Sequence, residues 1–114
     1  RIIPKDIKYI LKIPKQEMLN SIRMVNTISE EIKITFTRKS IIFNSLSADN
    51  TDAKTELFMD TELDNFELNV NSRFFLDFIS HVNDNEFEIL LNKPSLPFIL
   101  KDKQFITVIM PIIV

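Results

Sequence analysis

Val70-Asn71-Ser72-Arg73-Phe74-Phe75-Leu76-Asp77-Phe78-Ile79 is the stretch that decides the fold, because the chain carries the same pattern a second time. The other copy is Ile13-Pro14-Lys15-Gln16-Glu17-Met18-Leu19-Asn20-Ser21-Ile22. In each copy an alternating, strand-like segment ends and a segment with helical spacing of apolar residues begins. The sequence therefore predicts one structural unit present twice.

The helical segments are residues 15–29 and 72–82. In the first, Met18, Ile22, Val25 and Ile28 recur at helical spacing downstream of Pro14. In the second, the apolar stripe consists of Phe75, Ile79 and Val82, and Asn71 or Ser72 is a natural N-cap. The opposite stripes are polar: Gln16, Asn20, Arg23 and Thr27 on the first helix, and Arg73, Asp77 and Ser80 on the second.

Period-2 alternation predicts strands in the remaining segments: 9–13, 32–36, 40–44, 54–60, 65–70, 86–91, 97–100 and 104–110. The element order is thus βαβββ repeated twice, with a polar loop at residues 45–53. We expect an α+β fold in which two helices pack side by side on one face of antiparallel sheet.

Composition excludes several kinds of site. The 114 residues are sized for one domain and include no cysteine, no glycine and one histidine, His81. Disulfides, zinc–thiolate sites and glycine-rich phosphate loops are therefore excluded, and a histidine metal cluster is not expected. Without glycine, turns must use Asn, Asp, Lys or Ser. We expect no cofactor and no metal.

Charge is unevenly distributed and no segment is apolar for the roughly 20 residues that a membrane span needs. Residues 1–39 carry nine basic and four acidic side chains, a charge of +5, whereas residues 40–114 carry five basic and twelve acidic ones, −7. Such asymmetry indicates either a surface that meets nucleic acid or an ordinary solvated face. Because the chain begins without methionine or a signal peptide, we expect a piece of a longer cytoplasmic protein.

Three motifs give this duplicated plan a family resemblance. Arg1-Ile2-Ile3-Pro4-Lys5, Val70–Asp77 and Val108-Ile109-Met110-Pro111-Ile112 resemble, in register, segments of the bacterial DNA polymerase III β sliding clamp. The resemblance is to the third, C-terminal domain of that family and spans the chain. It implies a DNA-clamp fold, with residues 1–7 as an interdomain linker remnant and residues 8–114 as the domain.

In that family, two protomers of three domains each form a ring around duplex DNA. The resemblance implies a non-catalytic processivity factor that docks polymerases, the clamp loader and repair proteins through a hydrophobic peptide-binding pocket. Carried over residue by residue, the pocket positions are Arg1, Ile2, Asn71, Phe74, Ser95, Pro97, Val108, Ile109, Met110, Pro111, Ile112, Ile113 and Val114. From the residues alone, a buried last strand at Val108–Met110 would be the favoured reading.

The sequence departs from the family pattern at this pocket. Phe74 stands where the family often has Tyr, and Ile113 where it usually has Arg. The loop after Glu31 is shorter, so an aromatic residue that borders the family's pocket has no counterpart. We expect apolar contacts to dominate peptide capture.

The resemblance implies two more surfaces. The DNA-facing residues would be Gln16, Asn20, Arg23 and Arg73, making non-specific contacts with phosphate and water. The surface that joins the other protomer would include Thr27, Ile28, Lys54 and Leu57, although Ile28 could instead lie in the core.

The residues bear on two other classes of function, an enzyme and a stand-alone binding module. His81 lies near a helix end and the carboxylates are scattered, so no catalytic pair is recognisable and no enzymatic activity is expected. A stand-alone peptide-binding or oligomerisation module remains the alternative, without encirclement of DNA.

Overall fold

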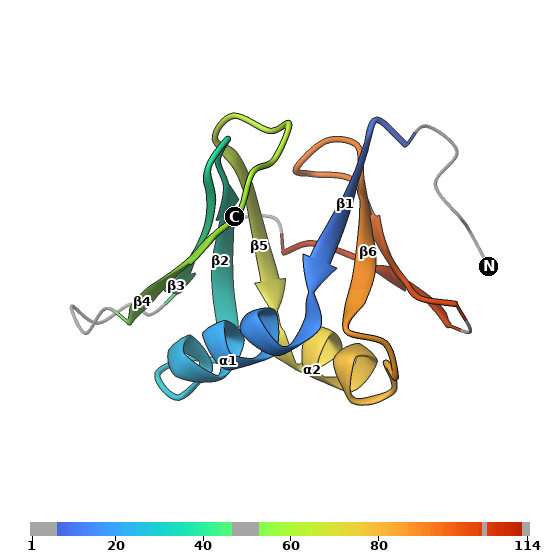
Figure 1. Ribbon diagram of the computed structural model, residues 1–114. Helices are drawn as coiled ribbons and strands as arrows, with labels where there is room; N and C mark the ends of the chain where they lie inside the picture. Colours follow the sequence, from blue (N-terminus) through green and yellow to red (C-terminus); the bar gives the residue numbers. More distant parts are fainter. Residues whose placement is uncertain (1–6, 47–52, 104, 113–114) are drawn as a thin grey trace.

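The computed structural model describes residues 7–46, 53–103 and 105–112. Two helices and eight strands follow one another in the predicted order (Figure 1). The elements are β1 (Tyr9–Pro14), α1 (Lys15–Asn26), β2 (Glu31–Phe36), β3 (Ser40–Ser45), β4 (Lys54–Phe58), β5 (Phe66–Asn71), α2 (Ser72–Ser80), β6 (Glu86–Leu91), β7 (Phe98–Lys101) and β8 (Ile106–Ile109).

The strands form two antiparallel sheets of four, which we call sheet A and sheet B. Sheet A has the order β1-β6-β7-β8, and sheet B has the order β4-β3-β2-β5. The first strand of each βαβββ unit therefore pairs with the strands of the other unit. Figure 1 shows β1 and β5 at the centre, with the two helices side by side beneath the sheets. The predicted α+β architecture is confirmed. The exchange of first strands between the two units was not predicted.

Each helix begins where its strand leaves the sheet. The backbone N–H of Lys15 donates to the Asn85 carbonyl at 2.8 Å, and that of Ser72 donates to the Glu30 carbonyl at 2.7 Å. These equivalent bonds satisfy N–H groups that have no partner within a helix's first turn. Only α2 also has a side-chain cap, from Asn71. The same anchoring at both helix starts supports the predicted duplication.

Both helices are shorter than their predicted ranges of 15–29 and 72–82. Thr27 caps the C-terminus of α1, and its hydroxyl donates to the Met24 carbonyl at 3.0 Å. Ile28 lies beyond this cap and is exposed, so the reading that put it in the core is wrong. Val82 also lies beyond its helix, but it is buried in the core.

The core lies between the helices and the inner faces of the two sheets. Helical positions Met18, Ile22, Phe75 and Ile79 are fully buried, as their spacing predicts. They belong to one cluster with alternate residues of β1, β2, β5, β6 and β7. One continuous core of this kind holds both units together.

Turns form without glycine, as the composition requires. Asn65 is the one described residue other than glycine with a positive φ, 59°, and it leads into β5. Asparagine tolerates this left-handed conformation better than most residues. Within the described ranges no helix is long and apolar enough to cross a membrane. The same residues include no group of three or more His, Asp or Glu side chains that could hold a metal ion.

Candidate functional site

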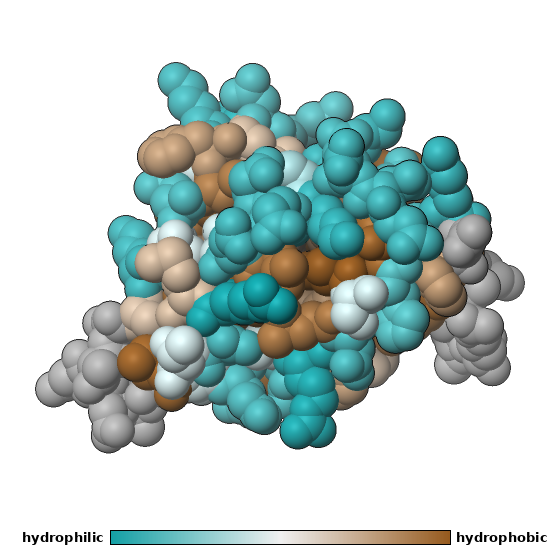
Figure 2. Space-filling view, turned by 60° about the horizontal axis from the view of Figure 1, so that its bottom comes forward, coloured by the Kyte–Doolittle hydropathy of each residue, from teal (hydrophilic) through white to brown (hydrophobic). Residues whose placement is uncertain are grey.

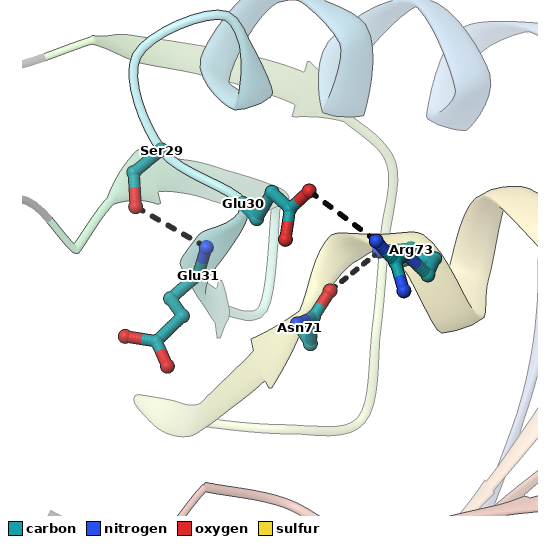
Figure 3. A network of polar contacts seen from close by, with 5 residues as sticks. All are labelled: Ser29, Glu30, Glu31, Asn71 and Arg73. Atoms are coloured by element: carbon teal, nitrogen blue, oxygen red, sulfur yellow. Dashed lines mark hydrogen bonds and ion pairs between the residues drawn. The ribbon is translucent and has the colours of Figure 1, made fainter.

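The start of α2 is fixed by a small polar network (Figure 3). The Asn71 side chain accepts a hydrogen bond from the backbone N–H of Arg73 at 2.9 Å, which caps the helix. The guanidinium of Arg73 lies 3.8 Å from the Glu30 carboxylate, with both side chains more than half exposed. Such a surface pair contributes little to stability. The backbone hydrogen bond from Ser72 to the Glu30 carbonyl, rather than this pair, ties the loop between α1 and β2 to the first turn of α2.

Phe74 projects from that first turn and is 50% exposed. Its neighbour Phe75 is fully buried and packs on Phe98 of β7, with ring centroids 5.8 Å apart. The helix thus fixes the direction of Phe74 through the burial of Phe75. A half-exposed aromatic side chain on a rigid turn is suited to contact an apolar ligand.

The C-terminal segment crosses from one sheet to the other. Ile109 ends β8 in the core of sheet A, and Pro111 is buried. The backbone N–H of Ile112 then donates to the Asn69 carbonyl of β5 at 2.6 Å. Met110 lies between these anchors and is 66% exposed. Ile112 therefore lies beside β5 at Asn69, which is two residues in sequence from the Asn71 cap.

The loop between β6 and β7 contains the predicted pocket residues Ser95 and Pro97. Ser95 is exposed and Pro97 is half-buried. Phe98 pairs with Ile109 in the sheet register, so Pro97 lies beside Met110, the next residue of the C-terminal segment. Leu96, which sequence analysis did not include, is an exposed apolar residue in this loop.

Among the predicted pocket residues that the structure describes, Ile112 lies against β5, which ends at Asn71, and Pro97 lies beside Met110. Ile109 is a core residue, and Val108 is half-buried. Arg1, Ile2, Ile113 and Val114 lie outside the described residues.

Two buried polar atoms near the end of β5 have no hydrogen-bond partner among the described residues: Oδ1 of Asn69 and Oγ of Ser72. Sequence analysis missed both residues. Asn69 gave no signal because it occupies an ordinary strand position, and Ser72 was considered only as a cap. Buried polar groups are normally satisfied, and these two atoms are exceptions that the described residues do not explain.

The predicted DNA-facing residues share one surface. Gln16, Asn20, Arg23 and Arg73 are all exposed on the two helices. The Gln16 amide donates to the Asn20 side chain at 3.1 Å. Figure 2 brings this side forward and shows a mainly hydrophilic surface with a central band of apolar atoms. The surface is polar rather than strongly basic.

The end of α1 meets β4, where the predicted protomer interface lies. Thr27, Ile28 and Lys54 are exposed, and the half-buried Leu57 packs against the core. Sequence analysis missed Met24 and Phe58, which are also exposed; Phe58 is 76% exposed. Three exposed apolar side chains, Met24, Ile28 and Phe58, thus lie on these two elements and the turn after α1.

Comparison with known proteins identifies relatives of the whole chain. Residues 1–113 match the family model described as DNA polymerase III beta subunit, C-terminal domain. The Beta sliding clamp of Helicobacter pylori strain 26695 is 30% identical over 106 residues, which cover 90% of this chain and 28% of that protein. The chain therefore spans little more than a quarter of the length of this curated relative.

Solved structures agree with this match. A crystal structure of the Helicobacter pylori beta clamp bound to a DNA ligase peptide superposes with a TM-score of 0.91 at 30% identity, covering 98% of this chain and 31% of that one. The same clamp in complex with diflunisal gives a TM-score of 0.91 at 28% identity, covering 99% and 33%. The Caulobacter crescentus sliding clamp, 24% identical, shares the fold with a TM-score of 0.89 over 98% of this chain and 32% of that one.

Proposed function

The chain belongs to the DNA polymerase III beta subunit family, whose C-terminal domain it matches, and we propose that it is the last domain of a sliding clamp for DNA replication. Residues 8–114 would form this domain, and residues 1–7 would lead into it from a preceding domain. In this proposal the clamp is a non-catalytic cytoplasmic protein that tethers its partners to DNA by encircling the duplex.

Docking of partner peptides is the part of this function that can be tested on the domain alone. The carrying observation is the hydrogen bond from Ile112 to Asn69, which holds the C-terminal segment beside the start of α2. Phe74 and Met110 are both exposed and, in this proposal, would border the junction of that segment with α2. The Helicobacter pylori clamp was crystallised with a DNA ligase peptide, which supports the same role here.

In the proposed pocket, apolar side chains bind the peptide and polar atoms orient it. Phe74, Pro97, Met110 and Ile112 would supply the apolar contacts. Asn71 would supply the polar ones. Arg1, Ile2, Ser95, Val108, Ile109, Pro111, Ile113 and Val114 complete the proposed set. Peptides of polymerases, the clamp loader and repair proteins would compete for it.

The helix face would line the hole of the ring. Exposed Gln16, Asn20, Arg23 and Arg73 suit transient contacts with phosphate and water, which depend on salt rather than on base sequence. The end of α1 and β4, with Thr27, Ile28, Lys54 and Leu57, would join another protomer. A polar, weakly charged lining is compatible with sliding because it holds no fixed position on DNA.

Titration with a clamp-binding peptide tests the proposed pocket. A peptide of the QLxLF type, added to ¹⁵N-labelled chain, should shift the amide resonances of Asn71, Phe74 and residues 108–112. A scrambled peptide of the same composition is the control. Shifts confined to other surfaces, or no shifts at millimolar peptide, would contradict the pocket and favour the alternative of an oligomerisation module.

A further inference from the structure

Methionine is the residue type through which this chain is most open to oxidation. The sequence contains no cysteine and no tryptophan, and its four methionines are Met18, Met24, Met59 and Met110. Peroxides convert the methionine thioether to a sulfoxide, and in this chain no thiol competes for the oxidant. Exposure to solvent then decides which of the four reacts first.

The fold separates the four methionines by exposure. Met18 is fully buried on α1, and Met59 is half-buried against the core. Met24 near the end of α1 is 62% exposed, and Met110 in the C-terminal segment is 66% exposed. A peroxide in the solvent therefore reaches Met24 and Met110, while the core protects Met18.

Met110 is held in its exposed position from both sides. On one side, Ile109 is buried at the end of β8. On the other side, Pro111 is buried, and the backbone N–H of Ile112 donates to the Asn69 carbonyl at 2.6 Å. The Met110 side chain cannot move into the core without breaking these contacts. Its thioether therefore stays accessible as long as the C-terminal segment is in place.

Oxidation changes what this side chain can offer to a peptide. Methionine suits an apolar binding surface because its thioether is polarisable and its flexible chain adapts to the ligand. The sulfoxide places a polar, chiral S=O group at the same position. An apolar peptide residue that covers this group removes its water without supplying a donor, which weakens binding. Phe74, Pro97 and Ile112, the other apolar contacts proposed for the pocket, contain no sulfur.

We propose that Met110 is a redox-sensitive modification site, and that its oxidation to the sulfoxide lowers the affinity of the pocket for clamp-binding peptides. Hydrogen peroxide transfers one oxygen atom to a lone pair of Sδ. The O–O bond breaks, an S–O bond forms, and the other oxygen leaves as water with both protons. Sulfur loses the two electrons that the peroxide gains. This inference rests on the proposed function, because it needs Met110 in the pocket.

The modification is reversible by a known type of reaction. A methionine sulfoxide reductase returns the sulfoxide to the thioether, and two thiols are oxidised to a disulfide as water is released. The chain itself has no cysteine, so these thiols must come from the reductase. Loss and recovery of peptide binding can therefore be followed on the same sample.

Peroxide treatment of the whole chain tests the proposal. Residual hydrogen peroxide is removed with catalase, and the oxidised fraction of each methionine is measured by peptide mass spectrometry. Affinity for a QLxLF-type peptide that contains no Met or Cys is measured by fluorescence anisotropy. We expect Met110 and Met24 to be oxidised well before Met18, and the affinity to fall about fivefold or more. Methionine sulfoxide reductase with dithiothreitol should restore it.

Variants assign the loss to one sulfur atom. Each is compared with itself before and after treatment, so its starting affinity does not enter the result. Met110→Leu should lose no affinity on treatment, whereas Met24→Leu, the matched control, should lose affinity as the parent does. Met110→Gln, which places a polar group at a similar reach, should weaken binding without any oxidant. Urea denaturation should show that the treated parent remains folded, because Met18 is protected.

Four results would overturn the inference while leaving the proposed pocket intact. A loss of affinity that persists in Met110→Leu would place the effect at another residue. Unchanged affinity of a chain whose Met110 is fully converted would show that the pocket tolerates the sulfoxide. Oxidation of Met18 as fast as Met110 would contradict the order set by exposure. Unfolding of the treated parent would attribute the loss to general damage.

Binding before treatment separates this inference from the proposed function. If the untreated chain does not bind the peptide, the proposed pocket fails and the inference fails with it. If the untreated chain binds and any of the four results is found, only the assignment of Met110 as a redox-sensitive site is removed.

Discussion

Replacing Phe74 by Ala separates ligand binding from folding. A phenylalanine side chain offers about 150–250 Å² of surface, and Phe74 is 50% exposed, so about 100 Å² is available to a ligand. At about 25 cal/mol per Å² this surface is worth at most about 2.5 kcal/mol, or roughly a 60-fold change in affinity. Ordering the peptide offsets part of that gain, so we expect Phe74→Ala to weaken binding of a QLxLF-type peptide by about tenfold or more.

The assay is a fluorescence anisotropy titration at a temperature where every variant is folded, with urea denaturation measured in parallel. Phe74→Tyr should bind within about threefold of the parent, because the ring is kept. Phe58→Ala removes the same group from the edge of sheet B and should leave peptide affinity unchanged, since Phe58 is distant in the fold from α2. An affinity for Phe74→Ala within twofold of the parent would refute the assignment of this side chain to the pocket.

The remaining predictions concern residues that hold the start of α2 and the C-terminal segment in place. Asn71→Ala should lower the free energy of unfolding by about 1 kcal/mol in urea denaturation, because the Arg73 N–H loses its cap; Asn71→Asp should retain most of that stability. Ile112→Pro removes the donor to the Asn69 carbonyl and should cost about 1–2 kcal/mol and weaken peptide binding. Unchanged affinity despite lost stability would mean that the C-terminal segment is not a wall of the pocket. Arg73→Gln should leave stability within about 0.5 kcal/mol, since its pair with Glu30 is exposed; a larger loss would show that the network in Figure 3 stabilises the fold.

The sequence predicts the elements well because burial follows local periodicity. Met18, Ile22 and Val25 are all fully buried on one face of α1, as are Phe75 and Ile79 on α2. Helix ends are predicted less well, because Ile28 fits the apolar spacing but lies after the Thr27 cap. The apolar spacing continues to Ile28, although the helical hydrogen bonds end before it.

Features that depend on distant partners could not be predicted. Nothing local to β1 or β5 indicates that each joins the sheet of the other unit, since strand pairing is decided by packing across the whole domain. The exposure of Met24 and Phe58 could not be predicted either, because the sequence does not show which apolar residues remain exposed to solvent. The contact of Ile112 with Asn69 depends on the path of the C-terminal segment between the sheets.

The exchange of first strands also sets the order in which the domain can be made. While the chain is synthesised, β1 emerges long before its partner β6, which begins only at Glu86. Until then the apolar face of β1, with Leu11 and Ile13, has no strand to pair with, and neither unit can complete a sheet by itself. Contacts between such distant segments make folding slow relative to local pairing. Sheet B can therefore form once β5 has been made, whereas sheet A must wait for β6, and a chain that stops before Glu86 would leave β1 as an unpaired edge prone to aggregation.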